Sequence, residues 1–230
     1  MDIWEFPDGK DVTIVCAELP ARLRLPYADP TNPDFVRLYR FADLDALFEI
    51  FGYIRATNPY NHVHICTSVE LDDDDYSNHL VALGGVDWNS LTREILGLVD
   101  LPVGQFSRAD DRDPGGFEVS HKGSRQVFRP VVDGHGGLVE DVAHFYRAPN
   151  PFDERRTVTI CNGNFARGTL AAVRALTDGR FRDRNDAYLA ARFPSGEQFS
   201  ILFRVFVVNG VVVTPDWTTS ILHEWPPRED

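Results

Sequence analysis

Short apolar runs alternate with helix-periodic segments in the first half of this chain, and this alternation constrains the fold most strongly. Residues 12–16, 63–67 and 80–83 are short β-prone runs. Residues 42–57 repeat apolar side chains at the spacing of one helix face, and a second helix is expected from about 88 to 99. Strands that alternate with helices predict a mainly parallel sheet covered on both faces. We therefore expect an α/β fold with a three-layer Rossmann-like architecture.

The second half of the sequence adds antiparallel signals to this pattern. Two short alternating runs between glycine clusters predict an inserted β-hairpin at about residues 115–130. Asn209-Gly210 is the strongest turn signal and predicts a terminal hairpin whose strands lie at the edge of the sheet. The remaining expected elements are strands at 142–146, 156–161 and 220–225 and helices at 170–176 and 185–193. We expect a single Rossmann-like domain over residues 1–230.

The charge balance argues against a nucleic-acid partner. The 230 residues include 23 Lys plus Arg and 35 Asp plus Glu, which gives a formal net charge of −12. Such a surface repels a polyanion, so we expect no direct contact with nucleic acid. No apolar run is long enough to cross a bilayer, and the first residues lack the features of a signal peptide. The chain is therefore predicted to be cytoplasmic, without a membrane partner.

The cysteine and histidine patterns do not predict a metal centre. Cys16, Cys66 and Cys161 form no CxxC pair and lie in apolar runs, so we interpret them as buried free thiols. His62 and His64 flank one residue of an expected strand, but spacing supplies no third ligand. The acidic run at residues 72–75 lacks the spacing of a calcium loop. We predict neither a metal site nor a cofactor.

Two glycine turns, each between an expected strand and a helix, are the candidate ligand site. Ligands of such sheets bind beyond the carboxyl ends of the strands, where helix N-termini attract negative charge. Neither turn matches a dinucleotide fingerprint or a phosphate loop, and a purely structural role for the glycines is the alternative. The residues expected to bind are Gly84, Gly85, Asn89 and Arg93 in the first turn and Asn162, Gly163, Asn164, Arg167, Gly168 and Thr169 in the second.

Two acids are candidates for catalysis. Glu18 follows the first strand at the edge where ligands gather, and Asp87 lies in the first glycine turn. Either carboxylate could stabilise positive charge while a base leaves a glycoside. Glu18 could also be an exposed loop carboxylate. A nucleophile elbow of the GxSxG type is absent from the sequence, so hydrolysis by a standard triad is not supported.

Several strings together resemble a known bacterial module. They are residues 4–9, 12–20, 26–30, 39–47, 84–89, 140–142, 149–151 and 159–163. In these strings the chain resembles the C-terminal module behind helix-turn-helix domains in actinobacterial transcriptional regulators, over nearly its full length. The resemblance implies a Rossmann-like domain in an intracellular regulatory or defence setting and assigns no catalytic residue.

The chain departs from this pattern at its start and shows one further likeness. The similar region begins at Trp4, without a helix-turn-helix segment, so direct operator binding is not expected. The Gly-Gly-x-x-x-Asn turn, Asn150-Pro151 and residues 168–171 are distantly similar to an α/β module of archaeal surface-layer proteins.

These observations support one main functional hypothesis and two alternatives. We expect a regulatory or defence-associated module that binds a nucleotide or a related small anionic ligand. The first alternative is an enzyme that cleaves an N-glycosidic bond in a nucleotide such as NAD. The second is a protein-interaction domain without a ligand, whose partner is another protein or a second copy of the chain.

Overall fold

The computed structural model describes residues 2–108, 113–121, 123–194 and 198–227. The α-helices are α1 (Leu44–Thr57), α2 (Ser90–Leu98), α3 (Ala166–Arg174) and α4 (Arg182–Arg192), and the short 3-10 helices are η1 (Ala21–Leu23), η2 (Pro26–Ala28), η3 (Arg37–Arg40) and η4 (Asp75–Ser77). The strands are β1 (Val12–Cys16), β2 (Val63–Thr67), β3 (His79–Leu83), β4 (Val103–Phe106), β5 (Gly116–His121), β6 (Ser124–Phe128), β7 (Val131–Val132), β8 (Leu138–Asn150), β9 (Asp153–Gly163), β10 (Phe199–Val208), β11 (Val211–Val212) and β12 (Ile221–Trp225).

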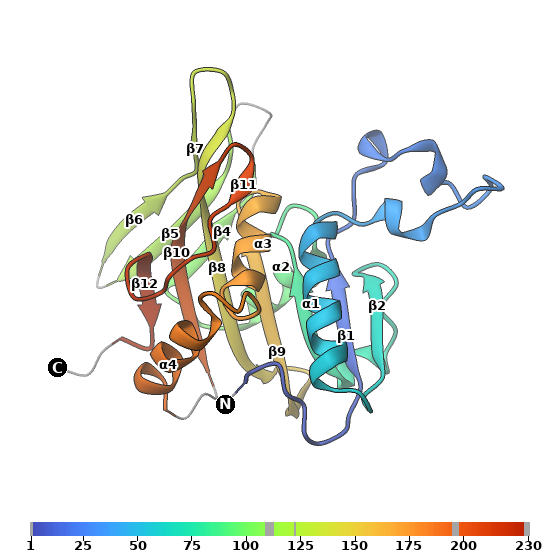
Figure 1. The fold of residues 1–230 in the computed structure, drawn as a ribbon, viewed down its shortest axis with the longest axis horizontal. Helices are drawn as coiled ribbons and strands as arrows, with labels where there is room; N and C mark the ends of the chain where they lie inside the picture. The colour runs from blue at the N-terminus through green and yellow to red at the C-terminus, as the bar shows by residue number, and fades with distance from the viewer. Residues whose placement is uncertain (1, 109–112, 122, 195–197, 228–230) are drawn as a thin grey trace.

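The fold is mixed α/β, with a curled central sheet and a separate antiparallel sheet (Figure 1). The central sheet has the order β11-β10-β8-β9-β3-β1-β2, and β7 and β12 pair with β8 and β10. Strands β9, β3, β1 and β2 run parallel, whereas β8 and β10 are antiparallel to their neighbours. Strands β4, β5 and β6 form the second sheet. The parallel part lets β1, β3 and β9 present their carboxyl ends at one edge.

The sequence predicted several of these elements correctly. The strands at 12–16 and 63–67 are found with the expected bounds. The expected terminal hairpin is also confirmed, because Asn209 and Gly210 both have positive φ angles, of 51° and 76°, between β10 and β11. The inserted hairpin is β5–β6, which β4 extends to three strands. Lys122, which belongs to the predicted turn, lies outside the described residues.

The position of the terminal hairpin differs from the prediction. Strand β10 is not an edge strand, because it pairs with β8 on one side and with β11 and β12 on the other. Strand β8 is also much longer than the expected run at 142–146, since it forms a hairpin with β9 over most of its length. Local sequence patterns do not reveal such pairing partners. Strands β8, β10, β11 and β12 therefore form an antiparallel part of the central sheet, next to the parallel strands.

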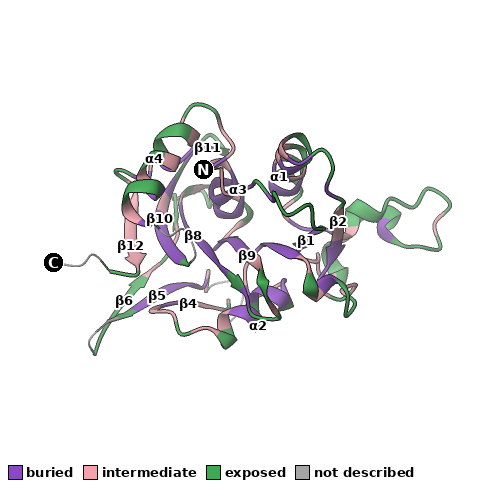
Figure 2. Ribbon diagram, turned by 90° about the horizontal axis from the view of Figure 1, so that it is seen from below, coloured by how far each residue is buried: buried purple, intermediate pink, exposed green. Residues whose placement is uncertain are grey.

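Both faces of the parallel strands are covered, as their continuous burial requires. Figure 2 shows α1 and α3 on one face of the parallel strands and α2 on the other, while α4 and the small sheet lie over the antiparallel part of the sheet. Alternate residues follow this division: Ile14 packs with the α1 and α3 core, and Val15 packs with Leu91 and Ile95 of α2. Each strand residue therefore faces one of the two layers, and its position in the strand determines whether its side chain can reach a given site.

Helix α1 packs on a face slightly different from the predicted one. The apolar spacing within residues 42–57 predicts that Leu44 and Phe48 face the core, but Phe48 is 84% exposed and Leu44 is 36% exposed. Ala46 and Ile50 take their place among the buried residues, together with Leu47 and Ile54. A small residue such as Ala46 carries little weight in a hydrophobic pattern, yet it allows the helix to approach the sheet closely.

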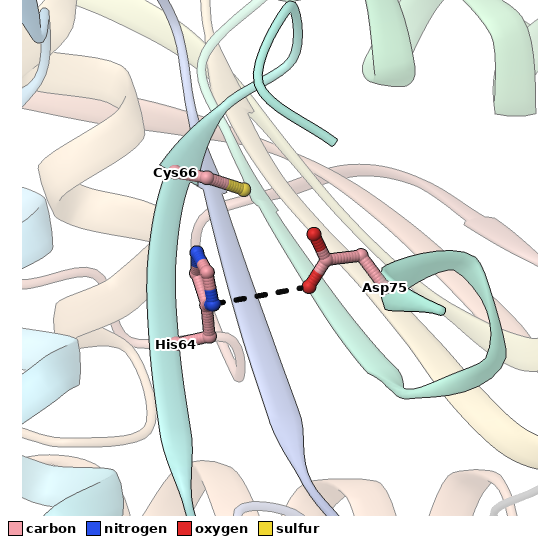
Figure 3. A group of neighbouring side chains, drawn as sticks. All are labelled: His64, Cys66 and Asp75. Carbon is pink, nitrogen blue, oxygen red and sulfur yellow. Dashed lines mark ion pairs between the residues drawn. The ribbon is translucent and has the colours of Figure 1, made fainter. Parts of the chain in front are cut away.

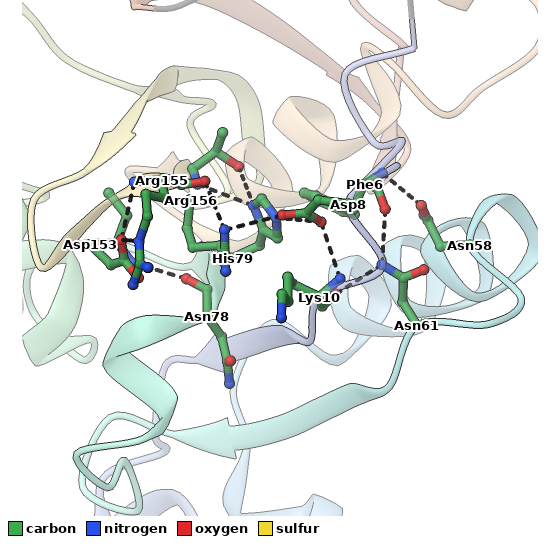
Figure 4. Close-up of polar contacts among 12 residues, drawn as sticks. Phe6, Asp8, Lys10, Asn58, Asn61, Asn78, His79, Asp153, Arg155 and Arg156 are labelled. Atoms are coloured by element: carbon green, nitrogen blue, oxygen red, sulfur yellow. Dashed lines mark hydrogen bonds and ion pairs between the residues drawn. The ribbon is translucent and has the colours of Figure 1, made fainter.

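A polar network closes the amino-terminal edge of the parallel strands (Figure 4). The backbone N–H of Thr157 donates to His79 Nδ1 at 3.1 Å, so Nε2 carries the proton and donates to Asp8 at 3.1 Å. Asn58, just after α1, accepts a hydrogen bond from the backbone N–H of Phe6 at 2.7 Å. The N-terminal segment is thereby fixed across this edge, which leaves the carboxyl edge for a site.

Two findings bear on the expected cellular environment. Cys16, Cys66 and Cys161 are buried free thiols, as predicted. Among the described residues, none of the helices is long and apolar enough to cross a membrane.

At the carboxyl edge, α3 approaches the end of β9 through a contact between two glycines. A Cβ atom on Gly168 would lie 2.7 Å from the Cα of Gly163 and 2.7 Å from a carboxylate oxygen of Asp141. Real Cβ atoms do not approach other atoms so closely, so a side chain at either glycine forces the helix away from the strand. The predicted glycine turn therefore has a packing function at these two positions.

We expect Gly168→Ala to lower the free energy of unfolding by about 2 kcal/mol or more, because the added methyl group overlaps backbone atoms and a carboxylate. The matched control is Gly97→Ala in α2, where a Cβ meets nothing within 4 Å and helix propensity predicts a gain of up to about 1 kcal/mol. Urea unfolding measures both values. Equal stability of the two variants would contradict the glycine contact.

Candidate functional site

A cavity of about 160 Å³ lies at the carboxyl edge of the parallel strands. We call it the edge pocket. It is lined by Ala17, Leu19, Ala42, Asp43, Gly85, Asp87, Trp88, Gln105, Arg108, Gly163, Asn164, Phe165, Ala166 and Thr169. Helix α1 follows β1 onto one face of the sheet, whereas α2 follows β3 onto the other (Figure 2). Such a change of direction opens a crevice between neighbouring strands, and open α/β sheets bind ligands there.

The two glycine turns meet in the edge pocket, and Gln105 of β4 joins them. Its Oε1 accepts a hydrogen bond from the backbone N–H of Val86 at 3.1 Å, and its Nε2 donates to the carbonyl oxygen of Gly163 at 3.1 Å. Gly85 leaves room for this side chain, because a Cβ there would lie 2.6 Å from Gln105 Nε2. A residue of the small sheet thus holds together loops that are far apart in the sequence.

Gln105 is also the end of a buried polar relay, formed by Ser200, His144, Asn162 and Gln105. Asn162 Nδ2 donates to Gln105 Oε1 at 2.8 Å, so Asn162 Oδ1 is the atom that accepts from His144 Nδ1 at 3.2 Å. His144 Nε2 then accepts from the Ser200 hydroxyl at 2.8 Å. Burial lowers the pKa of His144 to about 4. The relay is therefore neutral at physiological pH and fixes the orientation of Gln105.

Side chains of the protein already cap the helix N-termini at the edge pocket. Asn89 accepts hydrogen bonds from the backbone N–H groups of the first turn of α2. Asp141 accepts from the N–H groups of Phe165 at 3.1 Å and Gly168 at 2.8 Å, at the start of α3. Burial raises the pKa of Asp141 to about 7, against the effect of these hydrogen bonds. Binding of an anion in the pocket therefore relies on side chains more than on the amide groups of the helix N-termini.

Among the described residues that line the pocket, Arg108 is the cationic side chain. Its guanidinium lies 5.1 Å from the ring centre of Trp88 and 5.5 Å from that of Phe165, and its Nε donates to Asp87 at 3.1 Å. Cation–π contacts and the ion pair together hold a flexible side chain in one orientation. The Arg108 side chain remains 29% exposed, so it is accessible to a ligand.

Asp43 supplies a further charged group of the pocket, besides Arg108 and Asp87. It precedes α1 with a left-handed backbone, φ 55°, and its carboxylate is hydrogen-bonded by the Thr169 hydroxyl. Burial raises the pKa of Asp43 to about 6, and Thr169 and Arg108 oppose that shift. A carboxylate with a perturbed pKa in a cleft is typical of binding and catalytic sites.

Five of the predicted site residues line the edge pocket: Gly85, Asp87, Gly163, Asn164 and Thr169. Gly84 and Gly168 lie behind the lining and allow close packing. Gly84 has φ +99°, and a Cβ there would lie 2.7 Å from the Cβ of Ala17. Asn89 and Asn162 are completely buried, in a helix cap and in the relay.

Three predicted residues make contacts outside the pocket lining. Glu18 Oε1 pairs with Arg24 and Arg40, each at 2.8 Å, and so anchors the base of a projecting segment at residues 20–41 (Figure 1). Arg93 donates to the carbonyl oxygen of Val86 in the first turn. Arg167 pairs with Asp45 of α1 at 3.1 Å.

Five residues that define the site were not predicted from the sequence: Asp43, Trp88, Gln105, Arg108 and Phe165. Asp43 lies at the start of the helix predicted over residues 42–57, and Gln105 and Arg108 belong to a segment that carries no motif. Trp88 and Phe165 lie inside the two glycine turns, so their position next to predicted site residues could have marked them as candidates.

Neither a family model nor a curated protein matches this chain.

The relay predicts a specific pH dependence. His144 keeps a pKa of about 4 in the folded state, while the unfolded chain has a value near 6.5. Its stability contribution is therefore present above pH 6.5 and is lost as the pH falls to about 4, by roughly 3 kcal/mol. We expect His144→Gln to lose this part of the acid sensitivity. The free energy of unfolding in urea, measured against pH for the wild type and His144→Gln, tests this role of His144. The same pH dependence in both proteins would contradict it.

Proposed function

We propose that this chain is a regulatory module that binds a nucleotide or a related small anionic ligand in the edge pocket. The observation that carries this proposal is the Arg108 guanidinium, oriented by Asp87 and two aromatic rings inside a crevice at the carboxyl ends of parallel strands. The layers on the two faces of the sheet support a Rossmann-like classification as part of the same proposal.

Arg108 is the group that binds the anion in this proposal. The caps of α2 and α3 occupy amide donors that free helix N-termini would offer to a phosphate. A guanidinium can instead form two parallel hydrogen bonds with a phosphate or carboxylate. Because Asp87 already orients Arg108, the side chain loses less conformational entropy when the ligand binds.

Asp43 and Thr169 are the complementary polar groups. An ionised carboxylate accepts hydrogen bonds only, and so it suits the hydroxyl groups of a ribose. Asp43 also discourages a second negative group next to it, which favours a ligand with one anionic end and one hydroxylated end. A cavity of about 160 Å³ holds such a part of a nucleotide, while the exposed rim leaves room for the rest.

The regulatory setting in this proposal comes from the resemblance to regulator modules and from the overall charge. A net charge of −12 suits small-molecule or protein partners better than DNA. We place the protein in the cytoplasm on the same grounds. Ligand binding would then change the surface that a partner protein or a second copy recognises.

A thermal shift screen with nucleotides and sugar phosphates tests the binding proposal. We expect the unfolding midpoint to rise, since a ligand at 100 times its Kd stabilises the native state by about 2.7 kcal/mol. Arg108→Gln should weaken binding by roughly tenfold or more, because it removes a charge-assisted contact. Arg155→Gln, which removes an exposed ion pair with Asp153, is the matched control. A panel without any shift, or equal affinity of both variants, would refute the proposal.

Cleavage of an N-glycosidic bond is the second candidate, because two carboxylates, Asp43 and Asp87, line the pocket. Asp43 is the better positioned acid for this role, since Asp87 is neutralised by Arg108. We expect a protein with this activity to release the free base from NAD or a nucleoside and Asp43→Asn to abolish the release, as chromatography would detect. Base release at the wild-type rate by Asp43→Asn would exclude Asp43, and no release by the wild type would exclude the enzyme.

A further inference from the structure

Three side chains with metal-binding atoms meet at the edge of the parallel sheet, away from the edge pocket. They are His64 and Cys66 of β2 and Asp75 at the start of η4 (Figure 3). One ligand atom from each lies within 4.8 Å of the other two, and His64 Nδ1 is 4.0 Å from Asp75 Oδ1. We propose that His64, Cys66 and Asp75 bind a divalent transition-metal ion of the zinc type.

Strand geometry explains why two of the ligands are together. Residues two apart in a strand project to the same face, so His64 and Cys66 point to one side of β2. Their neighbours on β1 are Thr13 and Val15, which face the α2 side of the sheet. Figure 3 shows the Asp75 carboxylate facing both side chains from the loop that covers this side.

Hydrogen bonds hold the Asp75 carboxylate in position. Its Oδ1 accepts from the Thr13 hydroxyl at 3.0 Å, and its Oδ2 accepts from the backbone N–H of Asp72 at 3.3 Å. Asn78 in turn donates to the Thr13 hydroxyl at 3.1 Å. Metal-binding carboxylates and histidines are usually oriented by such outer contacts, which also affect affinity. The cluster is therefore organised before an ion arrives.

The negative charge at the cluster favours binding of a cation. The Asp75 side chain is only 7% exposed, and among the ion pairs of the described residues it pairs only with His64. The neighbouring acids Asp72, Asp73 and Asp74 are exposed and add negative potential. When the Cys66 thiol releases its proton to solvent and forms a bond to the metal, thiolate and carboxylate together balance a charge of +2.

The donor set selects the type of ion. One sulfur, one imidazole nitrogen and one carboxylate oxygen suit zinc or cobalt, whereas calcium and magnesium prefer oxygen ligands alone. In a tetrahedral zinc site these ligand atoms lie about 3.5 Å apart, so small side-chain rotations complete the geometry. Three protein ligands leave one position for water. The His64 side chain is 43% exposed, so solvent can reach the cluster from its side.

The test uses the full chain without an affinity tag, under reducing conditions. We expect one Zn²⁺ per chain in isothermal titration calorimetry and, with Co²⁺, a thiolate-to-cobalt charge-transfer absorption. His64→Ala, Cys66→Ser and Asp75→Asn should each weaken Zn²⁺ binding at least tenfold. The charge-transfer absorption should disappear in Cys66→Ser.

The controls are His62→Ala, an exposed histidine just before the same strand, and Cys161→Ala, a buried thiol elsewhere. Both should bind Zn²⁺ like the wild type, and circular dichroism establishes that each variant is folded. His64→Ala changes a side chain that is only partly buried, so its result is informative even if substitution of a buried residue unfolds the protein. Absence of Zn²⁺ binding by the wild type, or unchanged affinity in folded His64→Ala, would overturn the proposal.

Discussion

The site depends on the close approach of α3 to the end of β9. Gly163 and Gly168 lie in direct backbone contact, and the buried Asp141 carboxylate accepts hydrogen bonds from the first turn of the helix. A carboxylate at this position complements the positive end of the helix and satisfies amide groups that would otherwise be buried without partners. Because α3 is fixed in this way, Phe165 and Thr169 are held at the rim of the crevice between β1 and β3.

The small antiparallel sheet completes the edge pocket from the opposite face. Gln105 reaches from β4 between the two glycine turns, and the neutral relay through Asn162 and His144 fixes its orientation. Arg108, just after β4, brings the positive charge. An insertion that looks peripheral in the sequence thus supplies the bridge between the loops and the cation. The parallel strands provide the crevice, and the inserted sheet provides much of its chemistry.

The edge pocket and the histidine–cysteine–aspartate cluster belong to neighbouring parts of the same sheet. Cys66 pairs in register with Val15 of β1, and Ala17, the residue just after β1, lines the pocket. The loop after β2 also touches α2, because Ser68 accepts a hydrogen bond from the backbone N–H of Ser90 at 3.2 Å. The edge pocket therefore adjoins β1 and β3, which are buried throughout, whereas the cluster lies on the partly buried edge strand β2.

The sequence by itself determined the elements that depend on local physics. Hydrophobic runs defined β1 and β2, Asn209-Gly210 defined a tight turn, and the two glycine clusters marked the loops that form the pocket. Only the tertiary structure decided which side chains meet there. Gln105 lies in the inserted sheet and Arg108 just after its first strand, and Asp75 joins His64 and Cys66 through a loop, so no spacing in the sequence could reveal them. Local periodicity determines which face of a strand a side chain occupies. The distant residues that it contacts depend on strand order and packing, which cannot be read from a single sequence.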